Sequence, residues 1–187
     1  IGAVGHVATV TPFGTKPSII KTDSAFQGIV WKGLPIDQPS AWAFYEHNLV
    51  QGALPNGAKE VLVSQSLAQL VQLSVGDDMM AWFIGDETVR VRKFVISGLY
   101  ETGLSEMDKL FVLGDIDVLR QLNGWSTTQA SGLEIQLDDL AYLYETEDQV
   151  WLMTANRLDE DGNAYHLVNL IQLNPQIFAW LDLLDTN

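Results

Sequence analysis

Cysteine is absent from this sequence of 187 residues, and basic residues are scarce. The missing thiols exclude disulfide bonds, thiolate metal sites and cysteine nucleophiles. Ten lysines and arginines stand against 24 aspartates and glutamates, so the formal net charge is −14 at pH 7. A chain this acidic is repelled by the phosphate groups of nucleic acids and anionic lipids. We therefore expect no nucleic-acid partner.

Long hydrophobic runs are also missing, although 47% of the residues are hydrophobic. No run approaches the roughly 20 apolar residues that cross a bilayer. The hydrophobic content is nevertheless sufficient for a buried core. The sequence starts at Ile1 without a methionine, and we expect it to be a segment of a longer protein from which any signal or membrane helix has been cut.

The sequence motifs of common enzymes are absent or incomplete. No glycine-rich phosphate loop followed by Lys-Ser or Lys-Thr occurs, which argues against nucleotide binding. Ser105 lacks the frame of a hydrolase nucleophile, because Met107 stands where a glycine is required. His6, His47 and His166 are too widely spaced to form a metal-ligand pair within one segment. We therefore expect no catalytic residue, no bound metal and no cofactor.

Acidic residues gather at several predicted turns. Asp159, Asp161 and Asn163 have the alternate spacing of a calcium loop, but Ala164 stands in place of its glycine and Leu170 in place of its final glutamate. This pattern favours a solvated turn. The pairs at 77–78 and 138–139 stand where turns and helix N-termini favour carboxylates, so we assign them to capping rather than acid/base chemistry.

Periodicity predicts a chain of mixed α and β structure. Alternating or apolar runs predict strands at residues 6–11, 27–33, 60–63, 79–84, 89–100, 110–113 and 133–137. The stretch at 12–17, after the first of these strands, is rich in turn residues and predicts a turn. The short loop at 85–88 predicts that the two strands beside it pair antiparallel.

Capping patterns predict the helices. Ser40 caps 41–47, Ser66 with Gln69 forms a capping box for 67–71, and Asp115 caps 116–122, which ends at Asn123-Gly124. Two further amphipathic stretches are predicted at 140–151 and at 176–184, the second opened by Pro175.

An acidic loop at 101–108 joins two of the predicted strands and carries Leu104 and Met107. Exposed apolar side chains in a polar loop can serve as contact points for another protein. In the alternative interpretation, one of the two side chains folds back onto the core. Leu104 and Met107 are therefore the candidate partner-contact residues of the sequence.

The stretch at 95–115, VISGLYETGLSEMDKLFVLGD, resembles the periplasmic region of ABC-transporter permeases of the lipoprotein-releasing and MacB types. The resemblance keeps the same order over nearly the whole chain. A strand, a short helix and a Val-Gly-Asp turn begin at residue 60, paired strands follow, and a strand at 131–137 precedes an amphipathic segment at 175–187. FtsX-like permeases of cell division are relatives of this fold.

The resemblance implies an α+β fold with two subdomains. A membrane-proximal mixed α/β subdomain would comprise 1–50 and 131–187, and a smaller β-rich subdomain would be inserted at 51–130. Both chain ends would then face the inner (cytoplasmic) membrane, with this segment on its periplasmic side. The loop at 85–88 is too short for the chaperone-binding hairpin that some lipoprotein-releasing members carry.

The same resemblance implies that the chain is not an enzyme and relays ATP-driven transmembrane motion to export or lipoprotein release. The implied partners are a cytoplasmic ATP-binding subunit, a second permease copy, and a periplasmic protein or lipoprotein substrate. Two alternatives stay open: a freestanding hydrolase and a ligand-binding receptor domain. Apolar segments of about 20 residues on both sides of this sequence in its gene would favour the permease.

Overall fold

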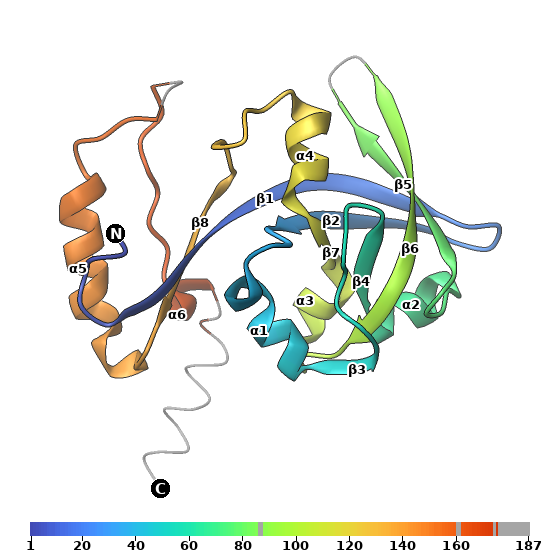
Figure 1. Ribbon diagram of the computed structural model, residues 1–187, viewed down its shortest axis with the longest axis horizontal. Coiled ribbons are helices and arrows are strands. Elements are labelled where there is room, and N and C mark those ends of the chain that lie inside the picture. Colours follow the sequence, from blue (N-terminus) through green and yellow to red (C-terminus); the bar gives the residue numbers. More distant parts are fainter. Residues whose placement is uncertain (86–87, 160–161, 174, 176–187) are drawn as a thin grey trace, which may run out of the picture. The chain divides into compact units, whose positions relative to one another are not determined.

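The structure, a computed structural model, describes residues 1–85, 88–159, 162–173 and 175 (Figure 1). Its helices and strands confirm the predicted α+β class. The described part contains no helix of the length and apolarity needed to cross a membrane. The chain divides into two compact units, here called the central unit, Thr11–Glu134, and the terminal unit, Ile1–Val10 with Ile135–Asn187.

This division differs from the subdomains expected from the sequence. The expected boundary near 131 lies close to the change of unit after Glu134, but residues 11–50 group with residues 51–130. The reason is that the first two strands pair into the same sheet as the strands of the expected insert. An inserted subdomain at 51–130 remains a prediction.

Six strands of the described chain form a closed sheet. The order of the strands around the sheet is β1, β2, β7, β4, β6 and β5. The sheet closes because β5 also pairs with β1. β2 pairs parallel with β7 and β4 with β6, whereas the other pairs in the ring are antiparallel. β3 lies beside β6, and β8 lies beside β1. The strands are β1 Val7–Lys21, β2 Phe26–Leu34, β3 Leu49–Gly52, β4 Glu60–Ser64, β5 Asp78–Ile84, β6 Val89–Tyr100, β7 Phe111–Asp115 and β8 Gly132–Leu137.

One face of the closed sheet forms the main core. The aromatic centre is Trp31, whose ring centroid lies 4.4 Å from that of Phe94 and 5.3 Å from that of Phe83. Gly114 lies against the Trp31 ring, because a Cβ there would come within 2.4 Å of a ring carbon. Helices α2 (Gln65–Val71) and α4 (Ile116–Asn123) add Leu67 and Leu119, among others, to the same cluster. Burying this much apolar surface is the main stabilising contribution.

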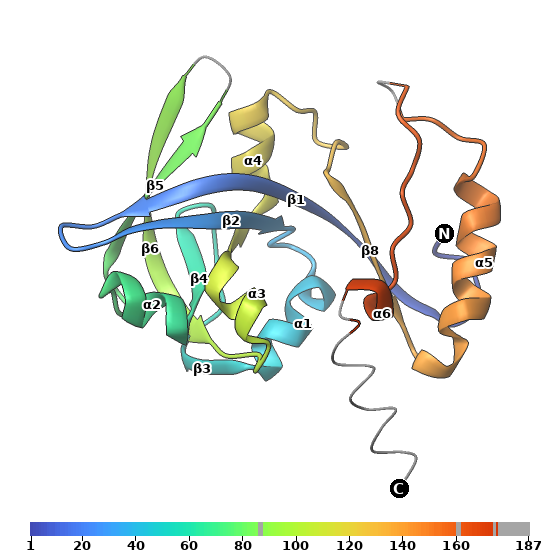
Figure 2. The same ribbon diagram turned by 180° about the vertical axis from the view of Figure 1, so that it is seen from behind.

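The other face is covered by α1 (Pro39–His47). Leu34, Leu62 and Leu113 point to this side because side chains alternate along a strand. They pack with Trp42 and Tyr45 of the helix. Figure 2 shows α1 beside α3 (Ser105–Leu110), with β1 and β2 running next to one another.

The terminal unit contains the 3-10 helix η1 (Leu140–Tyr142), α5 (Leu143–Thr154) and α6 (Leu170–Leu173). The His6 ring stacks on Tyr142 with ring centroids 3.5 Å apart, and its Nδ1 lies 3.2 Å from the Asp138 carboxylate. The helix predicted at 176–184 lies outside the described residues.

The structure corrects the predicted turn at 12–17, because β1 continues through both prolines. Pro17 pairs with Val30 of β2, and pairing of β1 with β5 begins only at Ser18. Pro17 therefore lies where β5 makes no ladder hydrogen bonds, so its missing N–H is tolerated there.

Two predicted helix caps are also wrong. α2 begins two residues earlier than the capping box predicts, because the buried Ser64 hydroxyl accepts from the backbone N–H of Leu67 at 3.1 Å. α1 begins at Pro39, which is favoured in the first helical turn, with Gln38 rather than Ser40 at the N-cap. The antiparallel β5–β6 hairpin and the Asp115 cap of α4 are confirmed.

Candidate functional site

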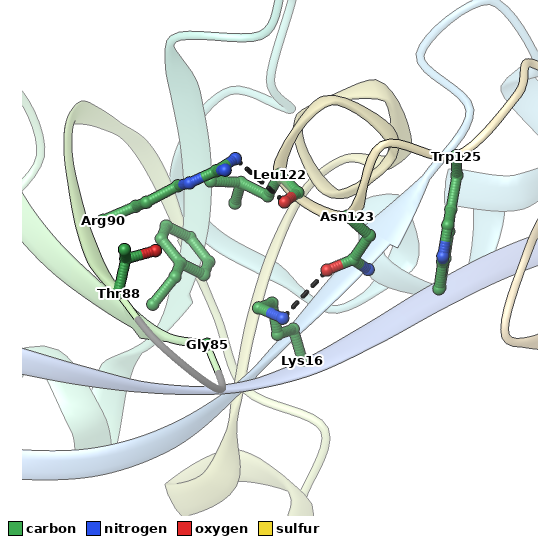
Figure 3. A pocket seen from close by; sticks show the side chains of 8 residues that line it. Lys16, Gly85, Thr88, Arg90, Leu122, Asn123 and Trp125 are labelled. Atoms are coloured by element: carbon green, nitrogen blue, oxygen red, sulfur yellow. Dashed lines mark hydrogen bonds between the residues drawn. The ribbon is translucent and has the colours of Figure 1, made fainter.

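A hollow of about 510 Å³ opens between β1, the β5–β6 hairpin and the end of α4 (Figure 3). All of its lining residues belong to the central unit. The two residues of the hairpin turn between Gly85 and Thr88 lie outside the described chain. The lining residues are Lys16, Phe83, Gly85, Thr88, Arg90, Leu122, Asn123 and Trp125.

The end of α4 determines one wall of the hollow. The helix stops at Asn123 because Gly124 adopts a left-handed conformation with φ of 67°, which glycine accepts without steric cost. The chain then turns, and the Trp125 backbone N–H donates to the carbonyl of Arg120 at 2.8 Å. This turn places the Asn123 side chain and the Trp125 indole on the same hollow (Figure 3).

Two cations approach this helix end from different strands. Lys16 Nζ on β1 donates to Asn123 Oδ1 at 2.8 Å, and the Arg90 guanidinium on β6 donates to the Leu122 carbonyl at 3.0 Å (Figure 3). Both bonds satisfy acceptors at a helix C-terminus, where the helix dipole favours positive charge. A lysine offers three N–H donors and an arginine five, so each cation retains donors for a further acceptor.

Neither cation has a carboxylate within 4.0 Å among the described residues. Elsewhere in the described chain, three cations pair with acids, Lys32 with Glu134, Lys93 with Asp78 and Arg120 with Asp117. Among the described residues, the hollow is therefore lined by two cations and no carboxylate, while the two turn residues next to it that lie outside the described chain, Asp86 and Glu87, are both acidic.

A second polar cluster is buried around Lys32 of β2. Lys32 is 8% exposed, its ammonium pairs with Glu134, and it lies 5.6 Å from the ring centroid of Phe13 and 6.0 Å from that of Tyr45. Burial acts to lower the pKa of Lys32, but the Tyr45 hydroxyl and the Glu134 carboxylate outweigh it and raise this pKa above 10.5. Burial has the opposite effect on the tyrosine and raises the pKa of Tyr45, because it disfavours the charged phenolate.

The groups around Lys32 favour a structural role. An ammonium that is neutralised by a carboxylate and covered by two rings has a stable charge and little access to a substrate. The pair instead ties Glu134, the last residue of the central unit, to β2.

Leu104 and Met107, the candidate contact residues of the sequence, are both half-buried. The predicted loop is wrong in its second half, where α3 begins at Ser105 and packs against α2 and β2. The buried Asp108 carboxylate fixes the segment by accepting from the hydroxyl of Thr102 at 2.7 Å and from its backbone N–H. A partner-contact role for Leu104 and Met107 remains a prediction.

The histidines of the sequence are not brought together in the described residues. No group of three or more His, Cys, Asp or Glu side chains there could hold a metal ion. Asp159 accepts from the backbone N–H of Asn163 at 2.7 Å, which is the bonding of a turn. Asp161 lies outside the described residues.

The acidic pairs have capping and pairing roles. Asp77 accepts from the backbone N–H of Ser74 at 2.8 Å, and Asp139 accepts from that of Ala141 at 2.9 Å. Asp78 pairs with Lys93, and Asp138 lies beside His6.

No family model matches the sequence, and no curated protein matches it. Solved structures do match. The extracellular domain of the noncanonic ABC-type transporter YknZ from Gram-positive bacteria is 14% identical, with a TM-score of 0.56 over 90% of this chain and 84% of that domain. The periplasmic region of MacB from Actinobacillus actinomycetemcomitans is 13% identical, with a TM-score of 0.53 over 95% of this chain and 78% of that region. The chain therefore has the fold of extracytoplasmic domains of ABC-type transporter permeases, as the sequence resemblance predicts.

Proposed function

We propose that this chain is the extracytoplasmic domain of an ABC-transporter permease subunit. The observation that carries the proposal is the shared fold, which extends over 90% of this chain in one transporter domain and 95% in another. In the proposed transporter, a separate cytoplasmic subunit hydrolyses ATP, and two permease copies hold their extracytoplasmic domains outside the inner membrane. The chain itself is not the enzyme.

The proposed role of the domain is to relay transmembrane motion to export or to lipoprotein release. Two chain crossings join its units, one in β1 between Val10 and Thr11 and one in β8 between Glu134 and Ile135. Units joined by few crossings can change their mutual angle while each keeps its own packing. This division supports a mechanical role.

The location can be tested by cysteine labelling, because the chain has no cysteine of its own. Asp23→Cys places a thiol on an exposed turn residue. In spheroplasts that express the full-length gene product, we expect a membrane-impermeant maleimide to label this thiol fully. Labelling that appears only after the cells are permeabilised would contradict the proposal.

The relay can be tested by measuring distances between spin labels in the reconstituted full-length transporter. Asp23→Cys with Trp151→Cys labels one exposed residue in each unit, and Asp23→Cys with Ser126→Cys labels two in the central unit. Between the nucleotide-free and ATP–vanadate states, we expect the first distance distribution to shift and the second to stay constant. Unchanged distributions for both pairs would contradict a relay by this domain.

Leu104 and Met107 are proposed as contacts of the domain with a partner protein. Replacing both with serine should leave the melting temperature near that of the wild type and impair transport by the full permease, because half-buried side chains lose little packing. A strongly lowered melting temperature, or a stable variant with normal transport, would count against the contact role.

A further inference from the structure

We propose that the ion pair of Lys32 with Glu134 is a clamp that fixes the place where strands β1 and β8 leave the closed sheet. Opening this boundary clamp gives the terminal unit a wider range of positions relative to the central unit. Both residues of the clamp belong to the central unit, so the inference does not rest on the transporter function.

Strand β1 changes its neighbours close to the boundary of the units. Its ladder with β2 begins at Gly14, opposite Gly33. One residue earlier, the carbonyl of Phe13 accepts from the backbone N–H of Ser131 at 2.8 Å, next to the start of β8. Residues 7–13 of β1 therefore precede the ladder with β2 and lie beside β8. Two-stranded ribbons twist more than larger sheets, so this ribbon is the place where a bend costs least.

The two residues at which the chain enters and leaves the central unit are both held by side chains of that unit. Thr11 is the first of them, 3% exposed, and its hydroxyl accepts from the side-chain amide of Gln38 at 3.3 Å. Glu134 is the last, and its carboxylate accepts from the ammonium of Lys32. Hydrogen bonds between charged groups are stronger than neutral ones. The ribbon is thus held on both strands, and most strongly at Glu134.

The surroundings of the pair oppose its opening. Lys32 is 8% exposed, and its ammonium lies 5.6 Å from the ring centroid of Phe13. Gly132 is on the same face of β8 as Glu134, because side chains alternate along a strand. A Cβ at Gly132 would come within 2.9 Å of a Phe13 ring carbon, so β8 packs closely on this ring. Moving the carboxylate away would leave a buried ammonium without a counter-charge, which is costly.

A contribution to stability alone is the alternative explanation of the same pair. In that case, loss of the pair lowers the melting temperature, but the ladders and the packing still hold the ribbon in place. The range of distances between the two units then stays that of the wild type. The two explanations therefore differ in a quantity that can be measured on the 187-residue chain.

The test measures distances between spin labels in the 187-residue chain. Asp23→Cys with Trp151→Cys labels one exposed residue in each unit, and Asp23→Cys with Ser126→Cys labels two in the central unit. In a Glu134→Gln background, we expect the population outside the wild-type distance peak to rise at least about fivefold for the first pair, as loss of a charged hydrogen bond allows. The distribution of the second pair should stay that of the wild type.

A variant without either charge keeps the test valid if Glu134→Gln unfolds. Lys32→Met with Glu134→Gln opens the clamp without leaving a buried ammonium unpaired, so it should fold and widen the same distribution. Thr11→Val removes only the neutral bond to Gln38 and should widen it less. Lys93→Met with Asp78→Asn is the matched control, because it removes an exposed ion pair between β5 and β6. This control should leave both distributions unchanged.

Several results would overturn the proposal. One is a folded variant without the clamp whose distances between the units equal those of the wild type. Equal widening in the Lys93→Met and Asp78→Asn control would show that the effect is not specific to the boundary. Widening of both label pairs together would indicate a general loosening of the central unit. Unfolding of the charge-free double variant would show that the pair is needed for the core itself.

Discussion

The two units of the chain bury their apolar residues to very different degrees. Among the described residues, every buried hydrophobic side chain except Val150 belongs to the central unit. The terminal unit instead exposes large apolar side chains on and around α5, including Tyr144, Trp151 and Leu152, the last of them 73% exposed. The central unit therefore contains the core that stabilises the fold, and the terminal unit mainly contributes surface.

This difference is reflected in the polar interactions. In the central unit, Lys32 and Ser64 are buried and have specific partners. In the terminal unit, the contact between His6 and Asp138 is open to solvent, with side-chain exposures of 37% and 59%. Because burial increases the strength of electrostatic interactions and the cost of losing a partner, the same kind of substitution should have different effects in the two units.

The largest difference is expected between two tryptophans. Trp31→Ala empties the centre of the closed sheet, where Trp31 is fully buried, and should lower the free energy of unfolding by about 3 to 5 kcal/mol. Trp151→Ala removes a side chain that is 57% exposed and should cost less than about 1 kcal/mol. Urea denaturation followed by circular dichroism measures both. Equal losses would show that the two units share one core.

The next difference concerns two polar pairs. Glu134→Gln leaves the buried Lys32 ammonium without a counter-charge and should cost about 1 to 3 kcal/mol. Asp138→Asn weakens only the exposed contact with His6 and should cost less than about 0.5 kcal/mol. Urea denaturation near neutral pH distinguishes them. If Glu134→Gln left the free energy of unfolding unchanged, water would be compensating the charge of the Lys32 ammonium.

The pH dependence provides an independent measurement of the Lys32 interaction. Because the folded state raises the pKa of Lys32, the interaction is fully stabilising below the unfolded value of 10.5 and is lost as the pH rises through the higher folded value. The raised pKa of Tyr45 acts in the same direction, since its neutral form is favoured in the fold. Between about pH 9 and about pH 12, the wild type should therefore lose more stability than Glu134→Gln, which lacks the carboxylate that helps to raise both pKa values. Parallel losses would contradict this coupling.

Local signals in the sequence were sufficient where neighbouring residues decide the structure. The β5–β6 hairpin follows from its short loop, and α4 follows from Asp115 at its start and Gly124 at its end. These patterns work because capping and tight turns satisfy backbone groups within a few residues.

Tertiary contacts explain where the predictions from the sequence were wrong. The segment at 101–108 is ordered by the buried Asp108 rather than by a local helix signal, and β1 includes Pro17 because β5 pairs with only part of the strand. The hollow depends on Lys16, Arg90 and Asn123, which lie far apart in sequence and meet only when the sheet closes. In strands whose sequence alternates between polar and apolar residues, a lysine and an arginine look like ordinary surface residues. No sequence signal could therefore identify this site.

The smallest difference is expected between two helix caps. Ser64→Ala removes the hydroxyl that accepts from the Leu67 N–H at the start of α2, and that also donates to the backbone carbonyl of Asp108 in α3. With both partners buried, the loss should be about 1 to 2 kcal/mol. Asp139→Ala removes the cap of η1 in the terminal unit, where water can replace the carboxylate, and should cost about 0.5 kcal/mol or less.

Thermal melts of both variants, with Ser66→Ala as a control for the serine that does not cap α2, separate the effects. If Ser66→Ala were as destabilising as Ser64→Ala, the assignment of the α2 cap to Ser64 would be wrong. If Asp139→Ala equalled Ser64→Ala, solvent exposure would not explain the difference between the units.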